Sequence, residues 1–410
     1  MLKKLLKALL SSHAVHTVKQ QMEYIDALED KYKDFEKDAL LRTFLQYKCI
    51  FSDVSIFSKL LLNILAFFSI PFVLLIYFVK GLSHKSRDEK NKKEVVFIDA
   101  NNKYGMSYDY SDRFPYEEVN VRFGEVFFYK IVKYPDVLGG SLNLWSLKKW
   151  IKLVIRYPYL PYLNFTCLLY LGLVNNIVNQ FHPSAIINAK VETNYTSSFI
   201  TWCCESRKIN YELIMHGDLF LNKSMAFNKF STIYIWDKYY KDMFTRLYVK
   251  ADAFIVFTPQ IFRPLINENV CPKVYATYYL SGTGDGDYIE NVSMIVQILN
   301  KLGTKGLKVH VRPHPRWSNV DELRKMCKRL NVEIEDYESM SVEASLANTK
   351  YVIGSFSTVL LQAYFANKDV IIDDLTNKKG YDECVEANYI LLSKKHLLLS
   401  DFLKDLCDVE

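Results

Sequence analysis

The stretch YVIGSFSTVLLQAYFANKDVIIDD (351–374) joins two short apolar runs through a segment that fits a helix. The runs YVIG and DVII are continuously apolar rather than alternating, which is typical of strands buried on both faces of a parallel sheet. A strand, a helix and a second strand in this order predict a right-handed crossover between parallel strands. The segment therefore predicts a doubly wound α/β fold.

The same alternation continues in both directions along the chain. Further strands are predicted at 95–100, 184–189, 211–216, 232–237, 253–258, 273–281, 307–315 and 332–337. Helices are predicted at 144–156, 163–180, 194–207, 287–303, 320–331, 341–350 and 393–408. This pattern predicts two Rossmann-like domains that face each other across a cleft, an architecture of the GT-B type. We expect a helical region at 1–92, a first domain at 93–271 and a second domain at 272–410, with a boundary at Cys271-Pro272.

Two N-terminal segments have membrane-associating character. Residues 1–10, MLKKLLKALL, fit a short basic amphipathic helix that can lie on an anionic bilayer. Residues 60–79 carry no charge and are long enough to cross a hydrocarbon core, although Pro71 would kink a helix there. Three interpretations stay open for 60–79: a transmembrane helix, a re-entrant or interfacial helical hairpin, and a buried helix of the globular fold.

Composition excludes several classes of function. The net charge of +6 is spread over 410 residues, which argues against nucleic acid as a partner because such proteins concentrate their basic residues. The eight cysteines form no CxxC pair, so neither a zinc ribbon nor a redox motif is indicated. We expect reduced thiols, as in a cytoplasmic protein, and no metal site.

The strand predicted at 307–315 ends in the motif RPHPR (312–316). Ligands of open α/β sheets bind beyond the carboxyl ends of the strands, where this motif falls. Two prolines would stiffen the turn around His314, whose imidazole can donate a hydrogen bond to a leaving phosphate. Arg312 and Arg316 offer guanidinium groups that match phosphate geometry, and Pro315 completes the motif.

Two further loops at strand ends suit a nucleotide phosphate. Ser355, Ser357 and Thr358 lie at the predicted start of a helix, where backbone N–H groups and hydroxyls can bind an anion. We also expect Ser357 to cap that helix. The segment SGTGDGD (281–287) follows another strand, and Gly282, Thr283 and Gly284 would let the backbone approach a nucleotide closely.

Acidic and imidazole groups provide candidates for a general base. His216 and Asp218 follow the strand predicted at 211–216 and could take a proton from an attacking hydroxyl. Glu192 and Asp99 are alternatives, since each also follows a predicted strand. Glu338, after the strand at 332–337, could accept hydrogen bonds from a ribose or a base.

Taken together, His314-Pro315 and the hydroxyls of Ser355, Ser357 and Thr358 resemble the motifs of a bacterial enzyme family. These are the capsule and lipooligosaccharide transferases that use CMP-activated acidic sugars: the sialyltransferases, polysialyltransferases and capsule Kdo transferases. The resemblance covers roughly 180–375 and implies that His314 supports the leaving group and that the hydroxyls hold the CMP phosphate. The acidic motif of these families has only a partial counterpart in Gly217-Asp218.

The resemblance implies a membrane-associated glycosyltransferase at the cytoplasmic face of a bacterial inner membrane. It would move a CMP-activated sugar from its nucleotide onto a glycan or a lipid-linked glycan, by an inverting and metal-independent mechanism without a further cofactor. His216-Gly217 followed by His314-Pro315 also resembles the CDP-glycerol and CDP-ribitol polyolphosphate transferases. A nucleotide-sugar epimerase and a non-catalytic, membrane-tethered glycan-binding or export component are the remaining alternatives.

Overall fold

The computed structural model describes ten stretches of the chain: 16–83, 94–98, 116–119, 142–189, 191–215, 217–257, 271–281, 291–315, 318–355 and 357–407. The chain divides into two compact units. Unit 1 comprises Met1–His216 and Leu221–Phe257, and unit 2 comprises Gly217–Phe220 and Thr258–Glu410. Residues 1–92, expected to form a region of their own, are counted with unit 1, and the division after Phe257 lies earlier than Cys271-Pro272.

Unit 1 is built on a six-stranded sheet in the order β2-β1-β3-β4-β5-β6. The strands are β1 (Val95–Ile98), β2 (Tyr116–Val119), β3 (Ala185–Ala189), β4 (Asn210–Ile214), β5 (Lys229–Ile235) and β6 (Lys250–Val256). All of their pairings are parallel. The strand order reverses between β1 and β3, so this is the point at which a doubly wound sheet can bind a ligand.

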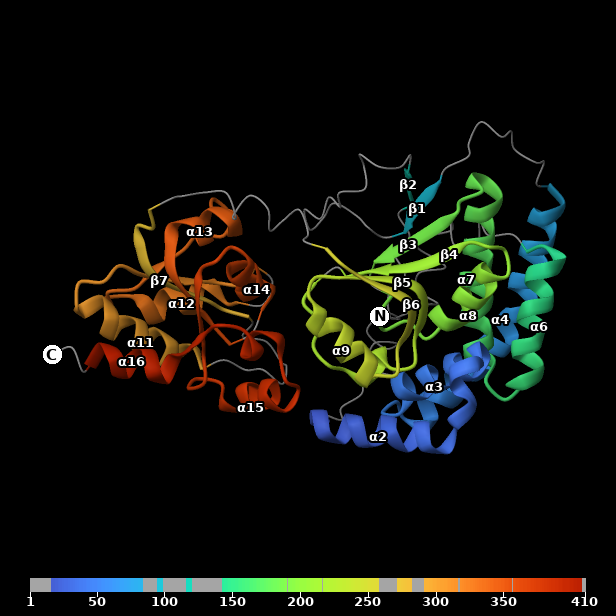
Figure 1. Cartoon of the computed structure of the whole chain (residues 1–410), viewed down its shortest axis with the longest axis horizontal. Coiled ribbons are helices and arrows are strands. Elements are labelled where there is room, and N and C mark those ends of the chain that lie inside the picture. The colour runs from blue at the N-terminus through green and yellow to red at the C-terminus, as the bar shows by residue number, and fades with distance from the viewer. Residues whose placement is uncertain are drawn as a thin grey trace. The chain divides into compact units, whose positions relative to one another are not determined.

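Helices pack around this sheet and around one another (Figure 1). They are α2 (Val18–Lys31), α3 (Ala39–Phe51), α4 (Ile56–Ser83), α6 (Leu144–Arg156), α7 (Pro161–Phe181), α8 (Ser197–Glu205) and α9 (Lys238–Arg246), with short 3-10 turns η1 (Lys33–Lys37) and η5 (Lys223–Met225). Helix α7 is buried almost all round, because α4, α6 and α8 each pack against it. The guanidinium of Arg42 in α3 donates to the carbonyls of Phe227, Asn228 and Tyr248. The N-terminal helices are therefore part of the unit 1 fold.

Unit 2 contains the sheet predicted from 351–374. Its strands are β7 (Val274–Tyr279), β8 (Val309–Arg312), β9 (Glu333–Ile334), β10 (Thr349–Gly354), β11 (Asp369–Ile372) and β12 (Leu397–Leu398), in the order β12-β11-β10-β7-β8-β9. Counted within the unit, this order reads 6-5-4-1-2-3, which is the dinucleotide-binding arrangement of a Rossmann fold. All five pairings are parallel. The strand order reverses between β7 and β10.

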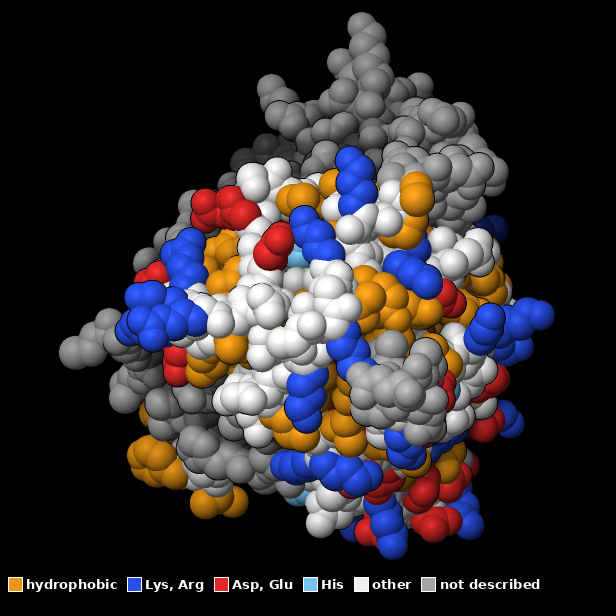
Figure 2. All heavy atoms as spheres, turned by 90° about the vertical axis from the view of Figure 1, so that its left-hand side faces the viewer, with side chains coloured by type: hydrophobic (Ala, Val, Ile, Leu, Met, Phe, Trp, Pro, Cys, Tyr) orange, Lys and Arg blue, Asp and Glu red, His pale blue; other side chains and the backbone are white. Residues whose placement is uncertain are grey.

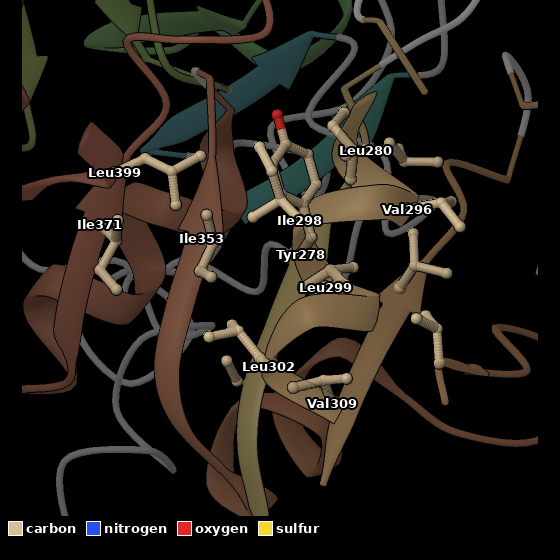
Figure 3. Close-up of a cluster of buried hydrophobic side chains, with 14 of the residues drawn as sticks. Tyr278, Leu280, Val296, Ile298, Leu299, Leu302, Val309, Ile353, Ile371 and Leu399 are labelled. Atoms are coloured by element: carbon tan, nitrogen blue, oxygen red, sulfur yellow. The ribbon is translucent and has the colours of Figure 1, made fainter. Parts of the chain in front are cut away.

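The helices of unit 2 are α11 (Val292–Thr304), α12 (Val320–Cys327), α13 (Val342–Asn348), α14 (Thr358–Phe365), α15 (Lys378–Glu386) and α16 (Leu399–Cys407), with the 3-10 turn η7 (Ile390–Ser393). Helices α11, α12 and α16 share one apolar core with the strands, in which Leu299, Leu302 and Leu399 lie against Tyr278, Val309, Ile353 and Ile371 (Figure 3). The side chains of Asn291, Asn319 and Ser341 cap α11, α12 and α13. Local capping signals and the apolar pattern thus agree with the observed elements.

The prediction of two Rossmann-like α/β domains with N-terminal helices is confirmed, with corrections of detail. Helix α4 is continuous from Ile56 to Ser83, so of the three interpretations left open for 60–79 the helical hairpin is wrong. Only 22% of its apolar window is buried, which also excludes a fully buried core helix. Pro71 is exposed, so the ring of this residue does not disturb the face that packs on α7. The terminal segment 393–408 begins at the last residue of η7 and contains β12 before the expected helix, which starts only at Leu399.

Candidate nucleotide site of unit 2

Three of the predicted motifs follow three neighbouring strands of unit 2. The register places Ile353, Tyr278 and Val311 in one row across β10, β7 and β8. Because the strands are parallel, the loops that begin at Ser355, Leu280 and Pro313 leave the sheet at the same edge. Two strand spacings of about 4.8 Å separate β10 from β8, so the loop starts lie about 10 Å apart. The loops thus border the switch point of the sheet.

The loop after β10 leads directly into the N-terminus of α14. Ser357 occupies the N-cap position in extended backbone conformation, but its side chain accepts no hydrogen bond from the helix. The expected capping role of Ser357 is therefore wrong. Among the described residues, its Oγ is inaccessible to solvent and has no hydrogen-bond partner. Thr358 is the first residue of α14 and is half-buried. The first backbone N–H groups of a helix suit an anion, and the buried Oγ of Ser357 lies next to them.

Ser355 is buried and belongs to a hydrogen-bonded network under this loop. Its Oγ lies 3.3 Å from the hydroxyl of Tyr278, which donates to Oδ2 of Asp373 at 2.5 Å. Asp373 also accepts from the backbone N–H groups of Leu375 and Thr376, both at 2.9 Å. This network fixes the carboxyl ends of β7, β10 and β11 against one another. The structure therefore places Ser355 below the loop rather than on its open side.

The loop after β8 holds His314 in a defined backbone conformation. The backbone N–H of His314 donates to Oγ of Ser318 at 2.8 Å, and the N–H of Ser318 donates to the carbonyl of His314 at 3.2 Å. His314 is half-buried between Pro313 and Pro315, of which Pro315 is exposed. Two hydrogen bonds with Ser318 thus close the turn, and His314 lies at the same edge of the sheet as Ser357.

Arg312 differs from its expected role as a phosphate ligand. The guanidinium is buried, and it donates to Oε2 of Glu335 at 2.9 Å and to the carbonyl of Met340 at 2.8 Å. Oε2 of Glu335 also accepts from the hydroxyl of Ser345 at 2.6 Å. Burial leaves this ion pair little access to a ligand, so Arg312 supports the loop from beneath. Sequence reasoning missed Glu335, whose position after β9 places it beside the end of β8.

Several candidates lie elsewhere or outside the described residues. His216, Gly282, Thr283, Gly284, Arg316 and Asp99 are outside the described residues. Asp218 is half-buried in the segment Gly217–Phe220, which is counted with unit 2, and its carboxylate accepts from the hydroxyl of Tyr389. Glu338 is exposed in the turn after β9, where its backbone N–H donates to Asp336.

Glu192 is the described candidate in unit 1. It lies shortly after β3, at the point where the strand order of that sheet reverses, and it is buried. Its backbone carbonyl accepts from the side-chain amide of Asn228. Glu192 therefore occupies a ligand-binding position of the unit 1 sheet as well as a structural one.

The arrangement in unit 2 can bind an anion and assist a leaving group. The start of α14 and Ser357 offer hydrogen-bond donors for a phosphate, and His314 can donate to an oxygen on which charge develops. Where the structure describes the chain, no group of three His, Cys, Asp or Glu side chains could hold a metal ion. The donors present are hydroxyls, backbone N–H groups and an imidazole.

No protein-family model matches this chain, and no curated protein matches it. Among solved structures, it is similar to the UDP-GlcNAc 2-epimerase of Methanocaldococcus jannaschii in complex with UDP-GlcNAc and UDP, with 10% identity, a TM-score of 0.38 and coverage of 74% of this chain and 88% of that chain. It is also similar to the wall teichoic acid polymerase TagF, with 11% identity, a TM-score of 0.38 and coverage of 77% of this chain and 78% of that chain. A third similar structure is the UDP-GlcNAc 2-epimerase of Neisseria meningitidis bound to UDP-GlcNAc, with 10% identity, a TM-score of 0.40 and coverage of 72% of this chain and 85% of that chain. These values are low, and the fold rests on the two sheets themselves.

Proposed function

We propose that this chain is a glycosyltransferase that moves a sugar from a nucleotide-activated donor onto a glycan or a lipid-linked glycan. Unit 2 binds the nucleotide, and its phosphate lies at the start of α14 beside His314. The observation that carries this proposal is the hydroxyl of Ser357, which has no partner among the described residues and lies at a helix start, at the same sheet edge as His314. Unit 1 contributes the binding of the acceptor.

The proposed chemistry is a single displacement with inversion. A hydroxyl oxygen of the acceptor attacks the anomeric carbon, and the bond from that carbon to the phosphate oxygen breaks. The nucleotide leaves with the electron pair, and His314 donates a hydrogen bond to the oxygen that gains charge. The carboxylate of Asp218, already an acceptor for the Tyr389 hydroxyl, takes the acceptor proton. No metal ion takes part in this scheme.

The nucleotide is proposed to be CMP. The support is the sequence pattern of His314-Pro315 followed by Ser355, Ser357 and Thr358, which resembles that of transferases using CMP-activated acidic sugars. A sugar acid linked directly to a single phosphate gives a leaving group that one anion site can hold. The products in this proposal are CMP and an extended surface glycan.

A panel of nucleotides tests the proposal. The full chain is heated with CMP, CDP, UDP or GDP, and a nucleotide that binds the native state raises the melting temperature as its concentration exceeds the dissociation constant. We expect the largest shift with CMP. Nucleotide release from CMP-sialic acid and CMP-Kdo is then followed with an acceptor glycan and with EDTA present, and we expect release to persist.

Each other outcome assigns the chain differently. A shift with CDP alone, together with transfer from CDP-glycerol, would indicate a polyolphosphate transferase. A shift with UDP and interconversion of UDP-GlcNAc would indicate an epimerase. Glycan binding without nucleotide binding would indicate a non-catalytic component, and loss of activity in EDTA would contradict the metal-independent mechanism.

A further inference from the structure

One face of α4 is built into unit 1. Leu62, Ala66, Val73 and Tyr77 are buried and recur on one side of the helix, which packs against α7. Gly172 of α7 makes room for this contact, because a Cβ there would lie 2.5 Å from Cε2 of Tyr77. In addition, Oδ1 of Asn63 accepts from the backbone N–H of Tyr162 at 3.0 Å, which satisfies a donor at the start of α7. Helix α4 is therefore a fixed part of the fold.

The opposite face of α4 exposes large apolar side chains. They are Ile56, Phe57, Leu60, Ile64, Leu65, Phe67, Phe68, Phe72, Leu75, Phe78 and Val79, and Phe68 is 73% exposed. The apolar window Ile56–Val79 has a mean hydropathy of 2.4. Exposed aromatic residues in this number are rare on monomeric soluble proteins and mark an interaction surface.

Helix α6 adds a second exposed apolar stripe beside α7. Leu144, Ile151 and Ile155 are 69%, 40% and 74% exposed. Lys148 and Lys152 are exposed between them along the same helix. Apolar residues interleaved with lysines are typical of helices that lie in the interface of an anionic bilayer. Both α4 and α6 pack on α7, and Figure 1 shows them farther from the sheet than α7.

We propose that the exposed faces of α4 and α6 form one docking surface for an anionic lipid bilayer, with α4 lying in one leaflet rather than crossing the membrane. Crossing would separate α4 from α7, expose the apolar residues that cover each other there and remove the Asn63 contact. Docking keeps these contacts and places the exposed phenylalanines of α4 among acyl chains. Lys148 and Lys152 then lie level with the lipid phosphates.

The chemistry of the surface favours lipid over a protein partner. Interfaces between proteins carry polar groups, about one hydrogen bond for each 100–200 Å². Among the residues of α4 whose side chains the structure describes (56–79), the strongly exposed ones have no hydrogen-bonding group and no charge. On another face of the molecule, by contrast, basic, acidic and apolar side chains are interspersed (Figure 2, seen from the side on which α11 and α16 lie).

Flotation of the full chain with vesicles tests the proposal. We expect binding to vesicles of phosphatidylglycerol and phosphatidylethanolamine, and weaker binding to phosphatidylcholine alone. Phe68→Ser/Phe72→Ser should weaken partitioning about a hundredfold, since two large apolar side chains no longer enter the acyl region. The matched control Met294→Ser/Val385→Ser removes exposed apolar side chains of unit 2 and should leave partitioning unchanged.

Charge gives an independent readout on the same vesicles. Lys148→Gln/Lys152→Gln should reduce binding to anionic vesicles about tenfold and leave binding to phosphatidylcholine unchanged. Lys325→Gln/Lys328→Gln, which removes two exposed lysines of unit 2, should change neither. If the two double variants change vesicle binding equally, α6 does not face the lipid. This result would overturn the place of α6 in the docking surface.

Labelling from one side of the membrane separates docking from crossing. Asp34→Cys and Glu94→Cys place thiols at exposed positions before and after α4, in a parent in which the exposed Cys271 is replaced by serine. With vesicle-bound protein, an impermeant maleimide should label both positions. If only one of the two positions is protected from the maleimide, α4 crosses the membrane. If the protein does not float with vesicles but forms a dimer, and Phe68→Ser/Phe72→Ser dissociates that dimer, the surface binds a protein partner. Either result overturns the proposal.

Discussion

Each unit is built on its own six-stranded parallel sheet, but the two units differ in the side chains that they leave exposed. Unit 2 has polar groups at the carboxyl ends of its central strands, including the hydroxyl of Ser357, which has no partner among the described residues. Unit 1 has its most conspicuous exposed residues on helices, where α4 and α6 carry apolar faces. The same type of sheet therefore carries two kinds of surface: polar groups at a strand edge in unit 2, and large exposed apolar side chains in unit 1. The comparison shows that function must be located from exposed chemistry rather than from the sheet.

The largest effect is expected from the imidazole at the edge of unit 2. His314→Ala should lower turnover by about 100- to 10,000-fold, because a positioned hydrogen-bond donor to the leaving group is lost. His396→Ala is the control, since His396 is another half-buried histidine of the unit and its Nδ1 lies 2.8 Å from the Lys394 carbonyl. Nucleotide release measures both. Similar turnover in the two variants would remove His314 from the mechanism.

The ion pair beneath the same loop should matter for stability. Arg312→Met leaves the carboxylate of Glu335 buried without its partner, and the free energy of unfolding should fall by about 3–5 kcal/mol. Arg312→Met/Glu335→Leu removes both charges and should restore most of the loss. Urea unfolding followed by circular dichroism measures this. If Arg312→Met is as stable as the wild-type protein but binds nucleotide weakly, Arg312 is a ligand of the nucleotide after all.

Unit 1 should respond at the contact between α4 and α7. Gly172→Ala forces a Cβ against the ring of Tyr77 and should destabilise the protein by about 1–3 kcal/mol. Gly217→Ala adds a Cβ with no atom within 4 Å, so it should leave stability within about 0.5 kcal/mol. Gly172→Ala/Tyr77→Leu removes the colliding ring atoms and should recover stability. If Gly172→Ala alone is harmless, α4 is not held as described.

The smallest effect concerns the attachment of the N-terminal helices at acid pH. Burial disfavours the charged form of Asp53, but hydrogen bonds from Lys223 at 2.6 Å and His16 at 2.9 Å outweigh it and lower the pKa of the carboxyl. A lowered pKa gives stability that is complete above the unfolded-state pKa and is lost as the pH falls through the folded-state pKa. The free energy of unfolding of Asp53→Asn should therefore fall less steeply than that of the wild-type protein as the pH is lowered. Urea midpoints that fall in parallel for the variant and the wild-type protein as the pH is lowered would contradict this.

Sequence reasoning found β7, β8, β10 and β11 because each is a mostly apolar run that is followed by a polar segment. It could not assign Arg312, because its partner Glu335 lies 23 residues later and becomes a neighbour only once β8 pairs with β9. It expected Ser357 to cap α14, which depends on a side-chain rotation that the sequence does not encode. It expected a kink at Pro71 and left a helical hairpin open for 60–79, whereas α4 runs through Pro71 as one helix. Strand β12 has two residues inside an apolar stretch that reads as helix.

The most direct test of the anion site is a calorimetric titration of CMP against two serine variants. Ser357→Ala should weaken CMP about tenfold with little change in melting temperature, because that hydroxyl has no partner among the described residues. Ser341→Ala should lower stability by about 1 kcal/mol with unchanged affinity, since Ser341 accepts from the N–H of Ala344 and caps α13. Equal CMP affinity in both variants, or no measurable binding to the wild-type protein, would contradict the account.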